Sequence, residues 1–322
     1  MDRRRHPAAL TIQLARLPTP LVRLDRLSAA LGVDLWCKRD DLTGSALSGN
    51  KVRKLEWLLG AARAAGADTV LTTGGIQSNH ARATAIAARQ LGMRPVLLLR
   101  GADPGVPEAN LLLDRLVGSE IHWCTADEYR RRDDLLAELA SDVRQAGGVP
   151  YVIPEGGSNG LGALGYVAAA EELAEQDERG FDGMVCAVGS GGTLAGLAMG
   201  PDRGPVHGVA VVDDRATFAP RVEAIAREAR EHGAPPLRRE RERWSVVDGY
   251  QGPAYGVATP EMWDTIAWAA RTEGLVLDPV YTGKAMHALR SEVRAGRWGG
   301  RLLFWHTGGT YGLFGRGGEI PP

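Results

Sequence analysis

Patterns typical of strands and of helices alternate along this chain from about residue 68 to residue 305. The first pair is a strand at 68–73 followed by a helix at 79–91, and the last expected strand is at 301–305. Such alternation favours an α/β architecture built on open, twisted, mostly parallel sheets. The strand expected at 184–188 is apolar at every position, which predicts that both of its faces are covered.

The composition argues against several broad classes of protein. The chain has 322 residues, and its 38 basic and 39 acidic side chains give a formal net charge of -1, which argues against a general nucleic-acid binder. No apolar run reaches about 18 residues, and the N-terminal residues lack the apolar segment of a secretory signal. Three scattered cysteines do not form a disulfide framework. We therefore expect a cytoplasmic α/β protein of one large or two smaller domains, without a membrane partner, a nucleic-acid partner or a metal site.

The segment 48–56, Ser-Gly-Asn-Lys-Val-Arg-Lys-Leu-Glu, places Lys51 near the start of an expected helix, after an acidic turn at 40–44. The N-terminus of a helix disfavours a cation, and most lysines are simply solvated at the surface. A lysine held in a pocket beside cationic neighbours such as Arg53 and Lys54 instead has a lowered pKa and becomes a nucleophilic amine. Lys51 is therefore a candidate Schiff-base lysine.

A glycine-rich loop at 189–193, Gly-Ser-Gly-Gly-Thr, follows the apolar strand and begins a helix. Converging backbone N–H groups and the helix dipole make such a loop suitable for a phosphate group. The loop lacks the Gly-Lys-Ser/Thr ending of the ATPase phosphate loop and the GxGxxG spacing of a dinucleotide site. A tight turn without a ligand is the alternative interpretation.

A second polar turn lies at 73–80. Its Ser78 and Asn79 either cap the following helix or form a nest for a carboxylate or a cofactor oxygen, and His80 is either an acid–base group or an ordinary histidine. Open α/β sheets bind ligands at the carboxyl ends of their strands. This turn and three further polar turns therefore predict a single crevice, and the three are at 155–160, 278–284 and 306–310.

These segments together resemble the fold-type II pyridoxal-phosphate (PLP) enzymes, which have a fold like that of the tryptophan synthase β subunit. Within that group the chain is similar to the branch that contains D-cysteine desulfhydrase and 1-aminocyclopropane-1-carboxylate (ACC) deaminase. The resemblance extends from about residue 18 to residue 315. The matching segments are Lys38-Arg39-Asp40-Asp41, Gly49-Asn50-Lys51-Val52-Arg53-Lys54-Leu55-Glu56, Gly75-Ile76-Gln77-Ser78-Asn79-His80, Gly156-Gly157-Ser158-Asn159, Gly189-Ser190-Gly191-Gly192-Thr193, Asp278-Pro279-Val280-Tyr281-Thr282-Gly283-Lys284 and His306-Thr307-Gly308-Gly309.

The resemblance implies a homodimer in which each subunit has two α/β domains with the cofactor between them. The larger, PLP-binding domain would consist of residues 1–47 and 162–322, and residues 48–161 would form a smaller inserted α/β domain. It also implies roles for individual residues. Lys51 would bind PLP through a Schiff base, Asn79 would bond the hydroxyl of the ring, and Thr307 would face the ring nitrogen.

The same resemblance assigns the phosphate and substrate contacts. The phosphate would be held by Asn50, Lys54, Gly189, Ser190, Gly191, Gly192 and Thr193. The substrate would contact Ser78, Asn79, His80, Tyr255, Tyr281 and Thr282, and the catalytic residues would be Lys51, Ser78 and Tyr281.

Three positions place the chain nearer to the desulfhydrases than to the deaminases. The deaminases carry glutamate where this chain has Thr282, they lack the threonine found here at Thr307, and they have glutamine in place of His80. Tyr311 departs from the desulfhydrase pattern beside the ring-nitrogen site, so the identity of the substrate stays open.

The resemblance implies a PLP-dependent C–S lyase that converts D-cysteine, or a related β-substituted amino acid, into pyruvate, ammonia and sulfide. Lys51, released by the incoming amino acid, would remove the Cα proton before the β-substituent leaves. A neutral Thr307 gives a shallower electron sink than a carboxylate, which suits prompt loss of the β-substituent. ACC deaminase, cysteate sulfo-lyase and β-replacement synthase are the alternatives within this class. A catalytically silent protein that binds PLP or amino acids is the hypothesis from another class.

Overall fold

The computed structural model describes residues 11–237, 243–254 and 256–320. The strands are β1 (Leu21–Arg23), β2 (Asp34–Arg39), β3 (Thr69–Gly75), β4 (Arg94–Arg100), β5 (Glu120–Cys124), β6 (Pro150–Val152), β7 (Gly183–Val188), β8 (Val206–Ala210), β9 (Trp244–Val247) and β10 (Arg301–His306). The α-helices are α1 (Asp25–Leu31), α2 (Asn50–Ala64), α3 (Asn79–Gln90), α4 (Ala109–Leu116), α5 (Arg132–Gln145), α6 (Gly160–Gln176), α7 (Gly192–Met199), α8 (Arg215–Glu231), α10 (Pro260–Glu273), α11 (Thr282–Arg294) and α12 (Thr310–Phe314). Short 3-10 helices are η2 (Asp40–Leu42), η3 (Glu128–Arg131), η4 (Glu155–Gly157) and η5 (Gly317–Glu319).

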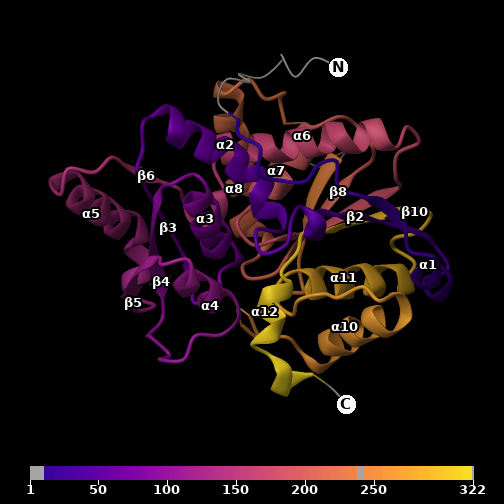
Figure 1. The fold of residues 1–322 in the computed structure, drawn as a ribbon. Coiled ribbons are helices and arrows are strands. Elements are labelled where there is room, and N and C mark those ends of the chain that lie inside the picture. Colours follow the sequence, from indigo (N-terminus) through magenta and orange to yellow (C-terminus); the bar gives the residue numbers. More distant parts are fainter. Residues whose placement is uncertain (1–10, 238–242, 255, 321–322) are drawn as a thin grey trace.

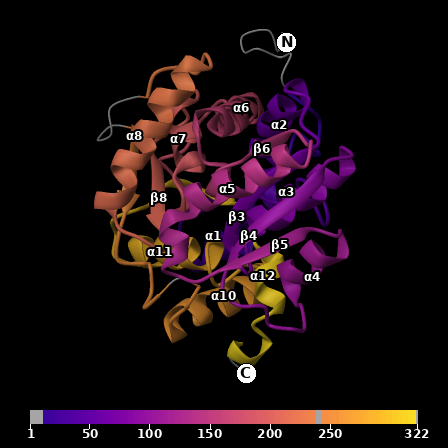
Figure 2. The same cartoon turned by 90° about the vertical axis from the view of Figure 1, so that its left-hand side faces the viewer.

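The strands form two separate sheets, which confirms the predicted α/β class. The larger sheet has the order β1-β2-β10-β7-β8-β9, and the smaller sheet has the order β5-β4-β3-β6. Neighbouring strands are parallel except β1 and β2. In Figure 1 the smaller sheet lies with α3, α4 and α5 on one side of the molecule, and the larger sheet lies with α10 and α11 on the other. Figure 2 looks onto the side that carries α5 and the smaller sheet.

The division into domains at residues 47/48 and 161/162 stays a prediction. The order of the strands supports it, because every strand of the smaller sheet falls between Thr69 and Val152. The helix α2 packs its apolar side chains into the same core cluster as α6 and α7, so the two parts share buried surface.

Strand β7 is buried at every position, as its continuous apolar sequence predicted. Met184, Cys186 and Val188 belong to one core cluster, whereas Val185 and Ala187 belong to another. Because successive side chains of a strand point to opposite faces, the two clusters cover the two faces of this strand. The prediction of a strand covered on both sides is confirmed.

The helix α8 is longer than its sequence pattern predicted. The helix pattern in the sequence predicts a start at Pro220. It begins instead at Arg215, since the Asp214 carboxylate accepts a hydrogen bond of 2.9 Å from the Thr217 N–H and caps an earlier turn. The polar, charged stretch at 231–243, which its composition predicts to be an exposed connection, includes residues 238–242, which lie outside the described residues.

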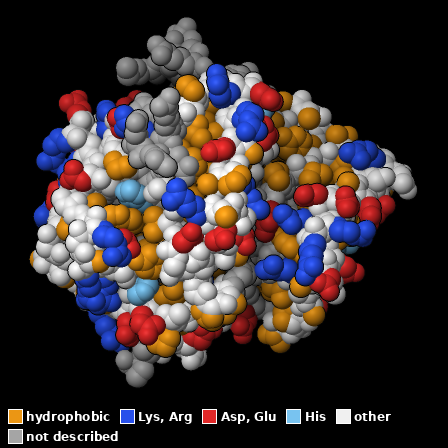
Figure 3. All heavy atoms as spheres, turned by 180° about the vertical axis from the view of Figure 1, so that it is seen from behind, with side chains coloured by type: hydrophobic (Ala, Val, Ile, Leu, Met, Phe, Trp, Pro, Cys, Tyr) orange, Lys and Arg blue, Asp and Glu red, His pale blue; other side chains and the backbone are white. Residues whose placement is uncertain are grey.

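No helix within the described ranges is long and apolar enough to cross a membrane. On the face of the molecule shown in Figure 3, acidic and basic side chains are interspersed with apolar ones. That face therefore carries no broad region of a single charge.

Candidate active site

A cavity of about 280 Å³ lies where the carboxyl ends of strands from both sheets meet the first turns of α2 and α3. This volume lies near the lower end of the range for small-molecule sites. The polar turns that the sequence placed in one crevice do come together here. The predicted residues that line the cavity are Asn50, Lys51, Ser78, Asn79, His80, Gly189, Ser190, Gly191, Thr193, Tyr281 and Thr307.

Four predicted residues do not line this cavity in the described structure. Lys54 and Gly192 are not among the residues that line it, and Thr282 is fully buried as the first residue of α11. Tyr255 lies outside the described residues. A direct contact between the ligand and the side chains of Lys54 or Thr282 therefore does not follow from this geometry.

Two facing glycines allow the start of α2 to approach the end of β10. A Cβ atom on Gly49 would lie 2.9 Å from the Thr307 carbonyl oxygen, and one on Gly308 would lie 2.8 Å from Gly49 Cα. The backbones are joined there by a hydrogen bond of 3.0 Å from the Asn50 N–H to the Thr307 carbonyl. This close approach brings Lys51 and Thr307 to the same cavity.

Lys51 differs from the other lysines of the chain. The sequence contains four, and Lys38, Lys54 and Lys284 are all buried with their amines bound to oxygen atoms of the protein. Lys51 is half-buried, lines the cavity, and has no hydrogen bond or ion pair within the described parts of the chain. Its amine is therefore the one lysine amine that a carbonyl compound in the cavity could reach.

The surroundings of Lys51 favour its neutral form. Burial lowers the pKa of Lys51 to about 8, and the carboxylate of Glu155 opposes this shift. The pKa of Lys54 is lowered well below its usual value, first by burial and then by the charge of Lys51. A deprotonated amine is nucleophilic and can accept a proton, so this environment prepares Lys51 for both tasks.

The glycine-rich loop forms a cradle at the start of α7. Gly191 has φ +89° and Gly192 begins the helix, so side chains are excluded where N–H groups converge. A Cβ atom on Gly192 would lie 2.7 Å from Ser158 Oγ and 2.8 Å from Lys54 Nζ. The loop fits a phosphate group by its backbone donors and by the positive end of α7.

Side chains from two other segments brace this loop. The Asn50 amide donates a hydrogen bond of 3.0 Å to Thr193 Oγ1. Lys54 Nζ donates to Ser158 Oγ at 3.0 Å, and Ser158 Oγ lies 2.7 Å from Ser190 Oγ. Lys54 is therefore linked to the glycine-rich loop by hydrogen bonds through Ser158 and Ser190.

The start of α3 supplies the opposite wall. Ser78 Oγ accepts a hydrogen bond of 3.1 Å from the Ala81 N–H, so the capping interpretation of Ser78 is confirmed. His80 is buried, its Nε2 lies 2.9 Å from Thr72 Oγ1, and burial lowers its pKa well below the usual value. His80 is therefore neutral at pH 7, and the N-terminus of α3 provides the positive potential at this wall.

A buried carboxylate shapes the turn that presents Tyr281. Asp278 accepts hydrogen bonds of 2.9 Å from the Tyr281 N–H, 2.8 Å from the Thr282 N–H and 2.6 Å from Thr282 Oγ1. The Tyr281 ring packs against Gly189, where a Cβ atom would lie 2.9 Å from Tyr281 Cε1. Thr282 thus helps to orient its neighbour Tyr281, which lines the cavity.

The outer wall contains residues that the sequence did not single out. They are Arg100, Tyr129, Arg132, Asp213 and Arg221, together with Glu155, which the sequence placed only in a polar turn. The Tyr129 hydroxyl donates to Glu155 at 2.8 Å, and Arg132 Nε lies 3.3 Å from the same carboxylate. For Arg100, Glu155 and Asp213, the available signal was their position at or just after the ends of β4, β6 and β8. With Lys51, four cationic and two anionic side chains line the cavity, which suits an anionic ligand.

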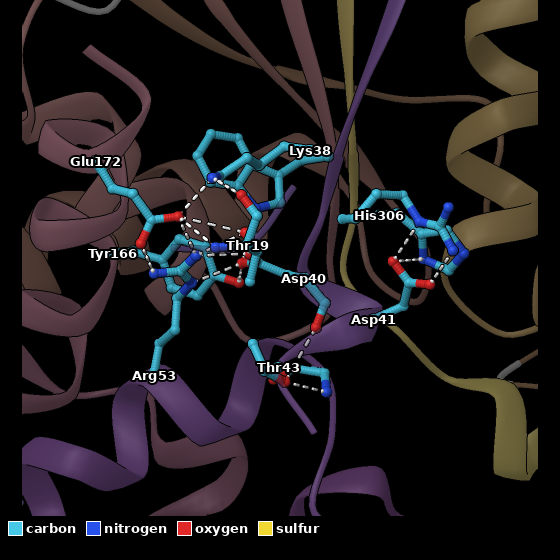
Figure 4. Close-up of polar contacts among 12 residues, drawn as sticks. Thr19, Lys38, Asp40, Asp41, Thr43, Arg53, Tyr166, Glu172 and His306 are labelled. Atoms are coloured by element: carbon cyan, nitrogen blue, oxygen red, sulfur yellow. Dashed lines mark hydrogen bonds and ion pairs between the residues drawn. The ribbon is translucent and has the colours of Figure 1, made fainter. Parts of the chain in front are cut away.

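A buried network beneath the cavity fixes the first turn of α2 (Figure 4). The Asp40 carboxylate accepts hydrogen bonds from Arg53, from the Tyr166 hydroxyl at 2.6 Å and from Trp305 Nε1 at 2.8 Å. Glu172 also binds Arg53, at 3.0 Å. The network joins α2, which carries Lys51, to α6 and to β10, which Thr307 directly follows.

Comparison with known proteins shows the family of the chain. A family model described as pyridoxal-phosphate dependent enzyme matches residues 12–308. The chain is 44% identical over 311 residues to a putative 1-aminocyclopropane-1-carboxylate deaminase of Thermotoga maritima, covering 95% of this chain and 98% of that protein. It is 41% identical over 324 residues to a mitochondrial bifunctional D-cysteine desulfhydrase/1-aminocyclopropane-1-carboxylate deaminase of Arabidopsis thaliana, covering 94% and 79%.

A solved structure shows the same fold. The crystal structure of an ACC deaminase homologue superimposes with a TM-score of 0.90 at 39% sequence identity, covering 97% of this chain and 95% of that chain. The lysine, the phosphate cradle and these relatives agree on the cofactor. The chain therefore belongs to the fold-type II family of pyridoxal-phosphate-dependent enzymes, uses PLP as its cofactor, and is a PLP-dependent lyase.

Proposed function

We propose that this enzyme catalyses β-elimination from D-cysteine or a closely related β-substituted amino acid. One D-cysteine and one water would give pyruvate, ammonia and hydrogen sulfide. The observation that carries the proposal is that the Lys51 amine, which has no partner among the described residues, lines the same cavity as the neutral Thr307, which directly follows β10. The Arabidopsis relative is named a D-cysteine desulfhydrase as well as an ACC deaminase.

The described residues have separate tasks in this proposal. Lys51 would hold the cofactor covalently, the loop at 189–193 would bind its phosphate, and the Asn79 amide would face an oxygen of its ring. The bound cofactor supplies an electron sink for the electron pair left when the Cα–H bond breaks.

Two walls of the cavity would orient the substrate for this proton transfer. The first turn of α3, with Ser78, would hold the substrate carboxylate, because the N-terminal end of this helix carries the positive end of the helix dipole. Tyr281 would limit the space opposite this turn. With the substrate so fixed, Lys51 Nζ would accept the Cα proton, since a pKa of about 8 leaves part of the amine neutral at physiological pH.

The nature of Thr307 favours elimination over more demanding chemistry. A hydroxyl at the ring nitrogen stabilises the protonated ring less than a carboxylate would, so negative charge at Cα would be held only briefly. Sulfide is a good leaving group and can depart under these conditions. Opening of a cyclopropane ring requires more charge stabilisation and an added proton.

ACC ring opening is the second candidate function. The Thermotoga relative is named a putative ACC deaminase, the solved structure is that of an ACC deaminase homologue, and the Arabidopsis relative is named for both activities. The polar outer wall, with Glu155 and Tyr129 bonded at 2.8 Å, offers groups that could deliver a proton.

One substrate panel on a single preparation distinguishes these functions. D-cysteine, L-cysteine, ACC, D-serine and cysteate are compared by release of keto acid and, for the cysteines, of sulfide, with the Lys51→Ala variant as the blank. We expect rapid release from D-cysteine and little or none from ACC. Equal turnover of ACC would refute the proposed preference, and absence of product from all five would favour a silent binding protein.

We also propose that the enzyme is a homodimer in the cytoplasm. Apolar side chains are exposed on or near α4 and α12, among them Leu116 and Phe314, whose exposed fractions are 75% and 71%. Light scattering after size-exclusion chromatography is expected to give twice the 34.4 kDa of one chain. A mass of one chain at micromolar concentration would contradict the dimer.

A further inference from the structure

Two side-chain amides join the segment before α3 to the start of α4. Gln77 and Asn110 belong to these segments, and Asn110 is completely buried. The residue before Asn110, Ala109, has φ +50°, a left-handed conformation that is strained for a residue with a side chain. Strain of this kind persists only where the surroundings hold the backbone in place.

Backbone groups determine how both amides are oriented. Gln77 Oε1 accepts a hydrogen bond of 2.9 Å from the Asn110 N–H, and Gln77 Nε2 donates one of 3.1 Å to the Glu108 carbonyl. Asn110 Nδ2 donates a hydrogen bond of 3.2 Å to the Gln77 carbonyl. A backbone N–H only donates and a carbonyl only accepts, so neither amide can be flipped without losing these bonds.

The fixed amide of Asn110 in turn determines the orientation of Asn79. Asn110 Nδ2 lies 3.1 Å from a side-chain atom of Asn79, which must be the acceptor Oδ1 because Nδ2 is a donor. The Asn79 NH₂ group is then the half of that amide left for other partners. Asn79 lines the cavity, and its Nδ2 has no hydrogen-bond partner among the described residues.

Packing alone does not explain an asparagine at position 110. Its Oδ1 is buried and has no hydrogen-bond partner in the described parts of the chain. A buried acceptor without a partner is destabilising, so an apolar residue of similar volume would avoid that cost. The donor function of Nδ2 toward Asn79 supplies a reason for the asparagine.

We propose that Asn110 is a positioning residue that holds the Asn79 amide with its NH₂ group toward the cavity. The site thereby offers N–H donors, and excludes the amide carbonyl, at the place where an acceptor oxygen of the cofactor or substrate binds. A flipped Asn79 would set its own NH₂ against that of Asn110 and present a carbonyl to that oxygen, so both contacts would become repulsive. The inference rests on the proposed placement of the cofactor beside Asn79.

Two variants of Asn110 test this inference. Asn110→Leu keeps the volume but removes the donor, which frees Asn79 to take either orientation. Asn110→Asp replaces the donor by an acceptor, which drives the Asn79 NH₂ away from the cavity. We expect the dissociation constant for PLP, measured by titration of cofactor-free protein, to rise severalfold for Asn110→Leu and at least about tenfold for Asn110→Asp.

The pH dependence of PLP binding distinguishes a changed orientation of Asn79 from a simple loss of structure. The carboxyl group that Asn110→Asp introduces can donate a hydrogen bond once it is protonated, so the ratio of this variant's dissociation constant to that of wild type should fall when the pH is lowered from 8 to about 5. Val149→Ala, at an exposed position before β6 that does not line the cavity, is the control and should bind PLP like wild type. The melting temperature of each cofactor-free variant reports structural damage.

The inference is supported if PLP affinity falls from wild type to Asn110→Leu and falls further in Asn110→Asp. It also requires that the affinity of the aspartate variant partly recovers at low pH. Equal affinity of the three proteins, or losses that simply follow the melting temperatures, would overturn it. Asn79→Ala is measured in parallel, because unchanged PLP affinity in that variant would instead refute the proposed role of Asn79.

Discussion

Arg53 and Asp40 form a buried ion pair two residues from Lys51, with 2.8 Å between Arg53 Nη2 and Asp40 Oδ1 (Figure 4). The side chain of Arg53 is 2% exposed and that of Asp40 is not exposed at all. The pair anchors the first turn of α2 to η2, and the Trp305 indole extends the same anchor to β10. The position of the Lys51 amine therefore depends on a charge network that never reaches the cavity.

Asp40→Asn should lower the free energy of unfolding by about 3 kcal/mol, because it leaves Arg53 buried with only Glu172 as a countercharge. Urea unfolding at pH 7 measures this loss. Glu120→Gln is the control, since its pair with Arg94 is 46% exposed on both sides and should change stability by less than about 1 kcal/mol. Burial raises the pKa of Asp40, but Arg53 outweighs it and the net pKa is lowered. The stabilisation is thus present above the unfolded pKa near 4 and is lost as the pH falls through the folded pKa, so the two proteins should converge in acid.

Lys51→Ala should yield a protein without the yellow colour of a covalent cofactor and without lyase activity. Borohydride reduction of the wild-type holoenzyme followed by peptide mapping should place the label on Lys51, since the amines of Lys38 and Lys54 are bound within the protein. A label on any of the three other lysines would show that the assignment is wrong.

Gly191→Asp should weaken PLP binding by far more than tenfold, because it puts a carboxylate at a φ of +89° where a phosphate dianion is to bind. Gly191→Ala carries the same backbone strain without the charge and serves as the comparison. Cofactor retention after dialysis measures both. If the aspartate variant retained as much cofactor as the alanine variant, the loop would have only a structural role.

Glu155→Gln should lower the pKa of Lys51 further, because the Glu155 carboxylate is what opposes the effect of burial. The rate at which cofactor-free protein forms its Schiff base with added PLP should rise through a midpoint near pH 8 in wild type and at lower pH in the variant. Asp213→Asn, also in the cavity wall, is the control and should leave the midpoint in place. A wild-type midpoint near the usual lysine pKa of about 10.4 would contradict the lowered pKa of Lys51.

Thr282→Glu should destabilise the protein, because the new carboxylate would be buried against Asp278, which now accepts a hydrogen bond of 2.6 Å from the Thr282 hydroxyl. Thr282→Ser keeps that bond and is the conservative control. We expect the melting temperature to fall by several degrees for the glutamate variant and little for the serine variant. We also expect the glutamate variant to gain no ACC ring opening, and a stable variant that opens ACC would refute this interpretation of Thr282.

The sequence determined the architecture because the relevant information is local. Periodicity along the chain predicted the strands and helices, and glycines at 49, 191 and 308 occupy backbone positions with positive φ that disfavour a side chain. The order of these motifs was enough to identify the cofactor family and to single out Lys51 as the candidate Schiff-base lysine. The predicted start of α8 at Pro220 was wrong because the Asp214 side chain caps an earlier turn.

The tertiary structure decided which side chains share the cavity, because that depends on contacts between residues far apart in the chain. It placed Arg100, Tyr129, Arg132 and Glu155 in the wall, and it buried Thr282 at the start of α11, where its hydroxyl binds Asp278. It also showed that Lys54 donates a hydrogen bond to Ser158, and that Asn110 from another helix donates one to Asn79. Local patterns cannot reveal these relationships, since hydrogen-bond partners are selected by the packing of whole elements against one another.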